Sequence, residues 1–329
     1  MNNTNEALLN GYIITEEKIE KIKDLNLNNI TERDSLGEKG FLWYHLNVGT
    51  EETRTWLKNK SGLSEIVIQE LISEETRPRI LKDDDGILIN LRGLNFNADS
   101  DEEDMVSLHM WIEPGRIITS RSERVLTMDE IDKSYDAGAG PLSINDFLIR
   151  VIDGITNKIS EYIYDMEEQI DDMEEEVLTG ETDRLRSQLS EKRRKTIIIR
   201  RYIVPQRELM ARLYREKIPW LTEANKEYIY EFSDRTIRLL EELDNIRDRA
   251  ALIHEEINNR INDQMNRTMY ILSIVGSIFL PLGFLTGLFG INIGGMPGVD
   301  NDSAFWIFSF SMVILIVIEY ILFKKNNWL

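Results

Sequence analysis

The stretch Gly287-Leu-Phe-Gly-Ile-Asn-Ile-Gly-Gly-Met-Pro-Gly298 separates the only two segments of the chain that are long and apolar enough to span a lipid bilayer. Residues 268–299 contain no Asp, Glu, Lys, Arg or His, and in residues 303–323 the only charged residue is Glu319. A hydrocarbon core about 30 Å thick requires about 20 apolar residues per helix. Lipid offers no hydrogen-bond partners, so each segment must be helical. Two helices cannot enclose a pore, so a channel would require several copies of the chain.

The loop and three other motifs resemble one family of membrane proteins. Gly290-Ile291-Asn292 resembles the Gly-Met-Asn signature of the CorA family of divalent-cation channels. The following Gly-Gly-Met-Pro-Gly, residues 294–298, is similar to its zinc-transporting ZntB branch, whereas the magnesium branch commonly has an acidic residue after Met-Pro. Residues 75–79, residues 200–208 and the terminal Trp328-Leu329 also resemble that branch. The ordered set of motifs is more specific than a Gly-x-Asn tripeptide.

The resemblance implies a fold class and an assembly. It implies an α+β cytosolic domain of the αβα type, followed by a long stalk helix and two transmembrane helices. It also implies a CorA-like homopentameric channel, in which the first spans line the pore and the second spans lie outside them. By this resemblance, six residues align with pore-facing positions of the family: Asn266, Met269, Leu272, Leu280, Gly283 and Asn292.

The residue pattern of the first span supports a pore in a slightly different rotation. Small or narrow residues recur in steps of four and three along one face; these are Met269, Ser273, Gly276, Leu280, Gly283, Gly287 and Gly290. A pore would use such residues to leave a lumen, whereas close helix packing of the small-xxx-small kind is the alternative. The two readings differ at Leu272 and Ser273, and both residues remain candidates.

The loop contains the candidate selectivity filter, Gly290, Ile291 and Asn292. In a pentamer, five Asn292 amides would form a neutral ring. Such a ring does not strip a divalent ion of tightly held water, but it hydrogen-bonds to the coordinated waters. Gly290 permits a turn and a close backbone approach. Asp300 and Asp302 would add negative charge at the extracytoplasmic mouth, or they are ordinary solvated loop residues.

Composition excludes several functions. With 329 residues and a formal net charge of −19, the chain is too acidic for nucleic acid, whose binding needs basic surface. It has no Cys, so thiolate metal sites are excluded, and no metal site is assigned. His254-Glu-Glu-Ile-Asn258 misses the second His of the HExxH zinc-protease motif. We find no P-loop, nucleophile elbow or GxGxxG, so the sequence predicts neither an enzyme nor an ATP-driven pump.

The chain divides into a series of predicted parts. These are a cytosolic α/β domain (1–140), a helical hairpin (141–215), a stalk helix (216–268), a first transmembrane helix (269–290), an extracytoplasmic loop (291–302), a second transmembrane helix (303–323) and a tail (324–329). Strands are expected at 40–47, 87–96, 105–113 and 116–120, and helices at 50–60 and 64–73, with Ser64 as an N-cap. Lys and Arg flank both spans but are absent from the loop, which places both termini in the cytoplasm.

Two helical segments have apolar seams. The hairpin seam recurs at steps of three and four; its members are Ile163, Met166, Ile170, Met173 and Val177. The acidic first helix and the basic second helix predict either complementary solvated charge across the hairpin or an acidic surface that concentrates or senses cations. The stalk begins after a predicted N-cap at Thr222, and its seam has near-heptad spacing: Ile229, Phe232, Thr236, Leu239, Leu243, Ile246, Ala250, Ile253, Ile257 and Ile261.

Beside the stalk seam, His254, Asn258, Asn262 and Asn266 form a polar stripe at i, i+4 spacing. We expect this stripe to face a wet central axis, although ordinary solvent exposure would explain it too.

Together these features predict zinc transport through a homopentameric pore in the bacterial plasma (inner) membrane, with no covalently bound cofactor and no nucleic-acid partner. Zn²⁺ is the expected cargo, and coupling to protons and the direction of flux stay open. The alternatives are a magnesium, cobalt or nickel channel of the same family, and a membrane-anchored sensor or scaffold that conducts nothing. Glu319 is either a residue near the membrane surface or a protonatable group linked to transport.

Overall fold

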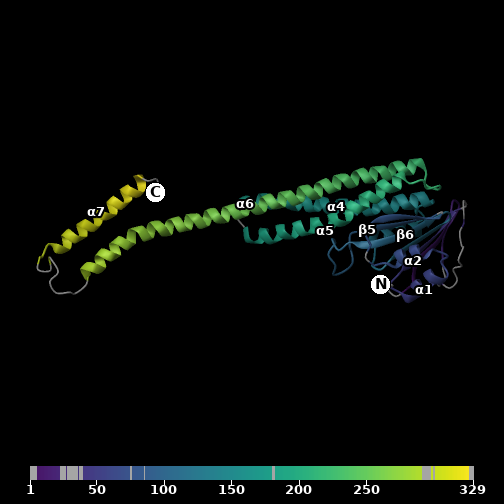
Figure 1. Ribbon diagram of the computed structural model, residues 1–329, viewed down its shortest axis with the longest axis horizontal. Coiled ribbons are helices and arrows are strands. Elements are labelled where there is room, and N and C mark those ends of the chain that lie inside the picture. The colour runs from purple at the N-terminus through teal and green to yellow at the C-terminus, as the bar shows by residue number, and fades with distance from the viewer. Residues whose placement is uncertain are drawn as a thin grey trace. The chain divides into compact units, whose positions relative to one another are not determined.

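The computed structural model describes residues 6–22, 27, 36, 40–74, 76–84, 86–179, 182–290, 298 and 301–325. By its internal contacts the chain divides into two compact units, Met1–His254 and Glu255–Leu329. The first unit contains a β-sheet and several helices, and the second contains the apolar end of the longest helix together with the last helix (Figure 1).

The sheet of the first unit has seven strands in the order β2-β1-β3-β7-β6-β5-β4. The strands are β1 (Leu8–Thr15), β2 (Ile19–Lys21), β3 (Gly40–Asn47), β4 (Arg79–Asp83), β5 (Gly86–Gly93), β6 (Val106–Glu113) and β7 (Arg116–Arg121). Only the central pair β3 and β7 is parallel, and every other neighbouring pair is antiparallel. The predicted strands at 40–47, 87–96, 105–113 and 116–120 correspond to β3, β5, β6 and β7.

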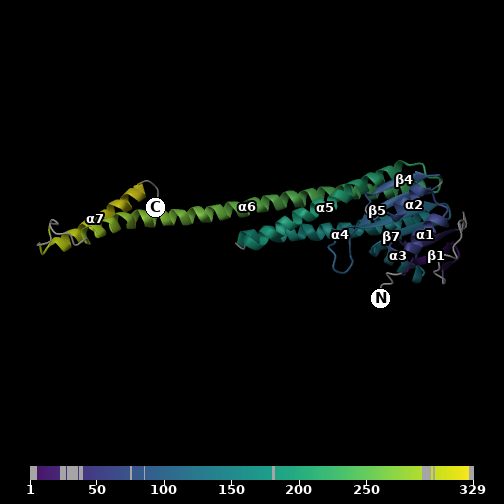
Figure 2. The ribbon, with the colours of Figure 1, turned by 60° about the horizontal axis from the view of Figure 1, so that its bottom comes forward.

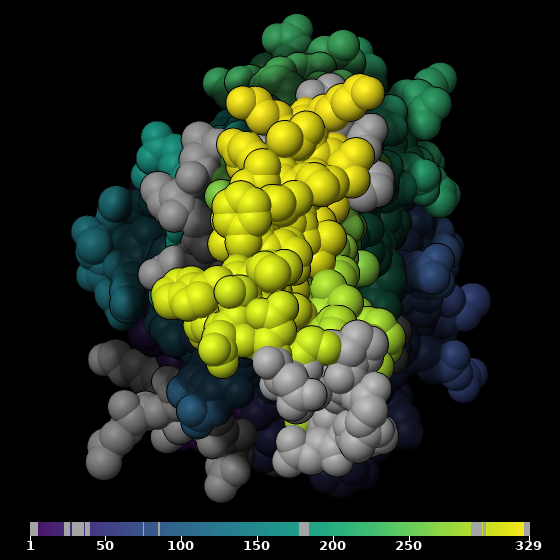
Figure 3. Space-filling model, turned by 90° about the vertical axis from the view of Figure 1, so that its left-hand side faces the viewer, coloured from purple at the N-terminus to yellow at the C-terminus, as the bar shows by residue number. Residues whose placement is uncertain are grey.

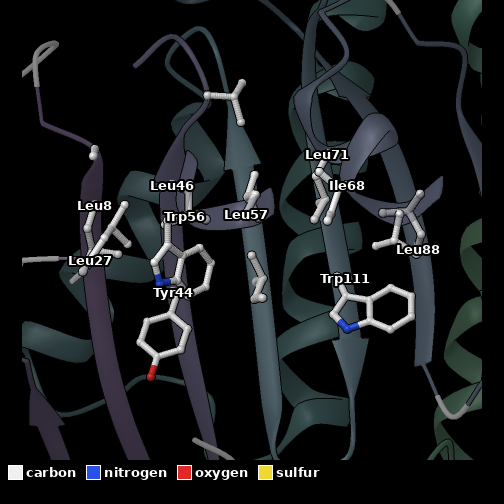
Figure 4. Close-up of a cluster of buried hydrophobic side chains, with 14 of the residues drawn as sticks. Leu8, Leu27, Tyr44, Leu46, Trp56, Leu57, Ile68, Leu71, Leu88 and Trp111 are labelled. Carbon is white, nitrogen blue, oxygen red and sulfur yellow. The ribbon is translucent and has the colours of Figure 1, made fainter. Parts of the chain in front are cut away.

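Helices cover both faces of this sheet. Helices α1 (Glu51–Asn59) and α2 (Glu65–Ile72) pack on one face, where Trp56 and Leu71 meet strand residues such as Leu46 (Figure 4). On the other face the Trp43 ring lies 5.6 Å from Tyr135 of α3 (Leu126–Asp136) and 5.1 Å from Phe147 of α4 (Ile144–Thr179). Successive residues of a strand point to opposite faces, so β3 is buried along nearly its whole length. This is the predicted αβα arrangement.

Side chains cap the starts of the first two helices, and the cap at Ser64 was predicted. The Thr50 hydroxyl accepts a hydrogen bond from the Thr53 amide (3.3 Å), and the Ser64 hydroxyl accepts one from the Val67 amide (3.4 Å). Each satisfies a backbone donor that a helix start leaves without a partner.

Beyond the sheet, α4 and α5 (Thr182–Arg215) run side by side along the first part of α6 (Glu223–Gly290), as Figures 1 and 2 show. All five residues of the predicted hairpin seam are buried. In the predicted α6 seam, every residue from Ile229 to Ile257 is buried, and Ile261 is half-buried. The Thr222 hydroxyl accepts a hydrogen bond from the Asn225 amide (3.3 Å), as an N-cap does.

Charged residues of both hairpin helices pair with α6. Asp171 and Glu174, near the far end of α4, both bind Arg249 of α6, at 2.5 and 2.7 Å. Arg200 of α5 likewise binds Asp244 of α6 (3.1 Å). Because α6 lies against both helices, it offers charged partners to each. The predicted charge complementarity across the hairpin stays a prediction.

A second contact that the sequence did not reveal joins the α/β part to the hairpin. Glu103 follows β5 in an acidic loop, yet its side chain is completely buried. Arg194 donates to one carboxylate oxygen (2.9 Å), and Lys195 lies 3.2 Å from the other. The Tyr162 hydroxyl of α4 donates to the same carboxylate (3.4 Å). A buried charge is costly unless it is paired, and here both neighbouring helices supply the partners.

In the second unit, the end of α6 lies beside α7 (Ala304–Lys325), as Figure 3 shows. The rings of Phe289 and Phe308 are 5.1 Å apart near the connection between the two helices. Phe323, at the other end of α7, is also buried. Both helices are long and apolar enough to cross a membrane.

Candidate pore-lining face

Most of the predicted pore-lining residues lie on the last part of α6, within the second unit. In the single chain these residues are exposed, with Asn258 and Gly276 only partly so: Asn258, Asn262, Asn266, Met269, Leu272, Ser273, Gly276, Leu280, Gly283 and Gly287. Leu280 is among the most exposed, at 74%. We call this set the pore face, and its role stays a prediction.

A different side of α6 is directed at α7. Apart from Gly276, the partly covered residues of the apolar segment of α6 are Ile274, Ile278, Pro281, Leu282 and Leu285. They recur at i, i+4, i+7, i+8 and i+11, and Phe289, which contacts Phe308, continues the series. At about 100° per residue, this series and the pore face lie on roughly opposite sides of the helix. The packing of α7 therefore leaves the pore face open.

The charged residues of α6 near the apolar segment lie on the side directed at α7 and not on the pore face. Arg260, Asp263 and Arg267 all fall on the side of the helix that continues toward α7. Arg260 donates a hydrogen bond to Glu256 one turn earlier (2.7 Å), which also lies on that side. From Asn258 to Gly290 the pore face thus contains amides, small residues and apolar side chains, with no charged group. This segregation is visible in the sequence once the rotation of α6 is known.

A neutral face of this kind has a definite chemistry. Mg²⁺ and similar hard divalent ions give up their water reluctantly. Amide side chains are hydrogen-bond partners for those waters but are not charged ligands that would compete with them. Among the described residues, no group of three or more His, Cys, Asp or Glu side chains is arranged to hold a metal ion. The face is suited to passage of a hydrated ion.

The proposed filter lies mainly outside the described residues. Ile291 and Asn292 are not described, and neither is Asp300, whereas Gly290 is the last residue of α6. Asp302 is described and exposed, two residues before α7 begins. The Asn301 side chain accepts a hydrogen bond from the Ser303 amide (3.0 Å) at this helix start. Asp302 is thus available to solvent at the connection.

Glu319 is not at the surface of α7. One of its carboxylate oxygens is buried and has no hydrogen-bond partner in the part of the chain that the structure describes. The residue is partly covered, on the same side of α7 as Leu315 and Phe323. Burial of an unpaired polar atom is unfavourable, so this carboxyl group lowers the stability of the folded segment.

The two His residues of the sheet are buried in its interior. His45 and His109 are each 1% exposed and lie within β3 and β6. Arg121 donates to Nε2 of His45 (2.9 Å), and Nδ1 of His45 lies 2.8 Å from the Thr119 hydroxyl. Burial, and then the charge of Arg121, lower the pKa of His45 well below its usual value. Both rings therefore belong to the interior of the sheet.

The chain thus combines an N-terminal αβα part with two C-terminal helices that are long and apolar enough to span a membrane. The chain belongs to the family of CorA-like Mg²⁺ transporter proteins, whose family model matches residues 38–325.

Two relatives and one solved structure place the chain within this family. It is 34% identical to the "Zinc transport protein ZntB" of Yersinia enterocolitica over 287 residues. This alignment covers 87% of this chain and 88% of the relative. It is 36% identical over 307 residues to the "Divalent cation transporter CmaX" of Pseudomonas aeruginosa, which covers 92% of this chain and 91% of that one. The solved structure of full-length CmaX superposes with a TM-score of 0.84 at 32% identity and covers 98% of each chain. The predicted membership of the CorA family and its ZntB branch is confirmed.

Proposed function

We propose that this chain is one subunit of a homopentameric channel that passes divalent cations, and zinc first among them, across the bacterial plasma membrane without ATP. The observation that carries the proposal is the pore face of α6. It is continuous from Asn258 to Gly290, it is uncharged, and it lies opposite the packing side of α7. A mere membrane anchor needs neither a row of amides nor the exclusion of charge from one side of its helix.

The choice of zinc rests on the relatives. Relatives named as zinc transport proteins match 87% of the chain, and the loop has Gly298 where the magnesium branch commonly has an acidic residue. The CmaX relative is named only as a divalent cation transporter. Magnesium, cobalt and nickel are therefore the competing cargoes. We place the large αβα part and both termini in the cytoplasm, because the flanking Lys and Arg residues favour that side.

The experiment is metal uptake into liposomes that contain the full-length protein and a metal-sensitive dye. Zn²⁺, Mg²⁺, Co²⁺ and Ni²⁺ are compared with and without a pH gradient. We expect zinc uptake to exceed that of the other ions and to require no ATP. A dependence on the pH gradient would add proton coupling. Uptake of none of these ions by a correctly assembled protein would refute a channel and favour the sensor or scaffold.

Two variants test the filter and the pore face. Asn292→Ala should abolish uptake while the oligomer stays intact, because it removes the amide ring. Asn262→Leu/Asn266→Leu should also block uptake, since a ring of branched apolar groups dewets a narrow lumen. The matched control is Gln264→Leu/Thr268→Leu, which replaces two polar residues four positions apart on a different side of α6. Equal uptake by the two double variants would show that the wrong side of α6 has been assigned to the axis.

A further inference from the structure

Two exposed helix faces of the hairpin have no partner within the chain. On α4, five carboxylates and one tyrosine recur at steps of three and four: Glu161, Tyr164, Asp165, Glu168, Asp172 and Glu175. All are exposed, and Tyr164 is 56% exposed. Within the described part of the chain, none of these carboxylates forms an ion pair. We call this face the acidic stripe.

The second face lies on α5. Arg186, Arg193 and Arg201 recur along one exposed side of this helix, with Ile197 at its centre. Ile197 is 59% exposed, so the middle of this face offers an apolar side chain to a partner. Arg201 stacks on the neighbouring Tyr202 ring and donates to its hydroxyl (2.8 Å), and none of the three arginines forms an ion pair within the described residues. We call this face the basic stripe.

The two stripes match each other in order and length. Lys192 of α5 hydrogen-bonds to Gln169 of α4, which fixes the level at which the two antiparallel helices lie side by side. From this pair, one residue forward on α4 corresponds to one residue backward on α5. Tyr164 is then level with Ile197, and Glu168 is level with Arg193. Likewise, Glu161 is level with the region of Arg201, and Glu175 is level with Arg186.

This agreement in level matters for a ring of identical subunits. Rotation about an axis parallel to the hairpin moves a residue to the neighbouring copy without changing its height. The hairpin lies along α6, held by the pairs from Arg249 to Asp171 and from Arg200 to Asp244. A ring axis that follows α6 therefore brings three carboxylates of one copy, Glu161, Glu168 and Glu175, to about the height of an arginine of the next. The exposed Tyr164 meets the exposed Ile197 at the middle.

We propose that the acidic stripe of α4 docks on the basic stripe of α5 of a second copy of this chain, and that this contact repeats around the ring. It rests on the homo-oligomer of the proposed function and names the surface through which the copies meet outside the membrane. The contact is heterologous, because two different faces meet, and such contacts generate closed rings when the rotation closes. Each stripe is about 21–23 Å long at about 1.5 Å per residue, so the two faces are equal in length.

The test uses cysteine cross-linking, for which the chain is well suited because it contains no Cys. Full-length Tyr164→Cys and full-length Ile197→Cys are expressed separately and together in one membrane, and a short bis-maleimide is added. We expect a cross-linked dimer of the two chains in the mixed sample, and no dimer with either variant alone. The matched control replaces Ile197→Cys by Ile66→Cys, a residue of α2 that is 63% exposed and belongs to neither stripe.

Charge reversal gives a second readout of the same contact. Glu168→Arg and Arg193→Glu should each shift the protein from oligomer toward smaller species in mild detergent. The two together in one chain should restore the oligomer, because every copy supplies both stripes. A cross-linked dimer from Tyr164→Cys alone, or no cross-link in a mixture that is oligomeric by light scattering, would overturn the proposal. So would a double variant that is no more oligomeric than the single variants.

These outcomes are separate from those that test transport. A protein that cross-links as expected but takes up no metal would refute the proposed channel and leave the docking surface intact. A protein that takes up zinc as an oligomer but does not cross-link would do the reverse.

Discussion

Protonation of His109 should destabilise the first unit in mildly acidic solution. The ring is 1% exposed on β6, and Nδ1 lies 2.9 Å from the side-chain oxygen of Asn90. The Asn90 amide nitrogen donates to Glu70 (3.0 Å), which orients the Asn90 oxygen toward the ring. Nδ1 of the neutral ring must therefore carry the proton. Burial, and then the charges of Arg92 and Arg79, lower the pKa of His109 to about 4, although a hydrogen bond with the Ser73 backbone acts in the opposite direction.

The sign and size of the effect follow from this pKa. The unfolded chain takes up a proton on His109 near its ordinary pKa of about 6.5, whereas the folded protein does so only near about 4. Between these values the unfolded state binds more protons, so stability is present above the upper value and is lost as the pH falls. Between about pH 7 and about pH 5 the loss is about 2 kcal/mol. His45 acts in the same direction, because its pKa is also lowered.

The measurement compares the thermal midpoint of the full-length protein with that of His109→Gln across this pH range, by tryptophan fluorescence in mild detergent. The variant should be less stable at neutral pH, because it loses packing, but its midpoint should fall less on acidification. For a unit of this size, about 2 kcal/mol corresponds to a difference of roughly 4–8 °C. If the midpoints of the two proteins fall in parallel as the pH is lowered, His109 is not the group that titrates and the reasoning fails.

Three further outcomes are expected. Glu103→Gln should lower the thermal midpoint by the equivalent of about 3 kcal/mol, because it breaks a buried charge cluster. Glu191→Gln, at an exposed partner of the same lysine, should cost less than about 1 kcal/mol. Asp300→Asn/Asp302→Asn should weaken apparent metal affinity in the uptake assay, and more at low salt, since exposed charges are screened within about 10 Å at 0.1 M. Equal weakening at both salt concentrations would instead indicate direct ligation. Glu319→Gln should keep the oligomer intact and match or exceed the wild-type midpoint, because it removes an unpaired buried carboxylate; a clear loss of stability would show that the charge has a partner.

The parts of the fold that could be predicted share one property, a strong apolar period. The seams of α4 and α6 were predicted correctly because their apolar residues recur at helical spacing. Such a pattern predicts a buried helix face without showing which helix packs against it. β3 and β6 were predicted from runs of apolar residues between turns. By contrast, β1, β4 and α3 were missed. Strands β1 and β4 lie toward the two edges of the sheet. Helix α3 has mixed polarity, with Asp and Lys among its apolar residues.

Polar partners were less predictable than apolar seams. Glu103 looked like one of several acidic loop residues, and its burial depends on Arg194 and Lys195, about ninety positions later in the chain. Arg249 likewise pairs with α4, although α5 is the neighbour in sequence and is rich in positive charge. A charge pattern shows how many partners are available but not which of them the fold brings within about 4 Å.

At the apolar end of α6, both the residue spacing in the sequence and the contacts in the structure are needed to interpret the helix. Its sequence shows amides and small residues at a regular spacing, which close helix packing and a lumen explain equally well. The position of α7 separates these readings in part, since Phe289 contacts Phe308 of α7 and the partly covered residues of α6 lie in phase with Phe289. The small residues of the pore face are thus not used for packing within the chain, and Arg260 and Arg267 are turned away from them. In the proposed ring the pore face is covered by other copies or by water, and a continuous neutral surface that contains Asn262 and Asn266 is better matched to water than to lipid.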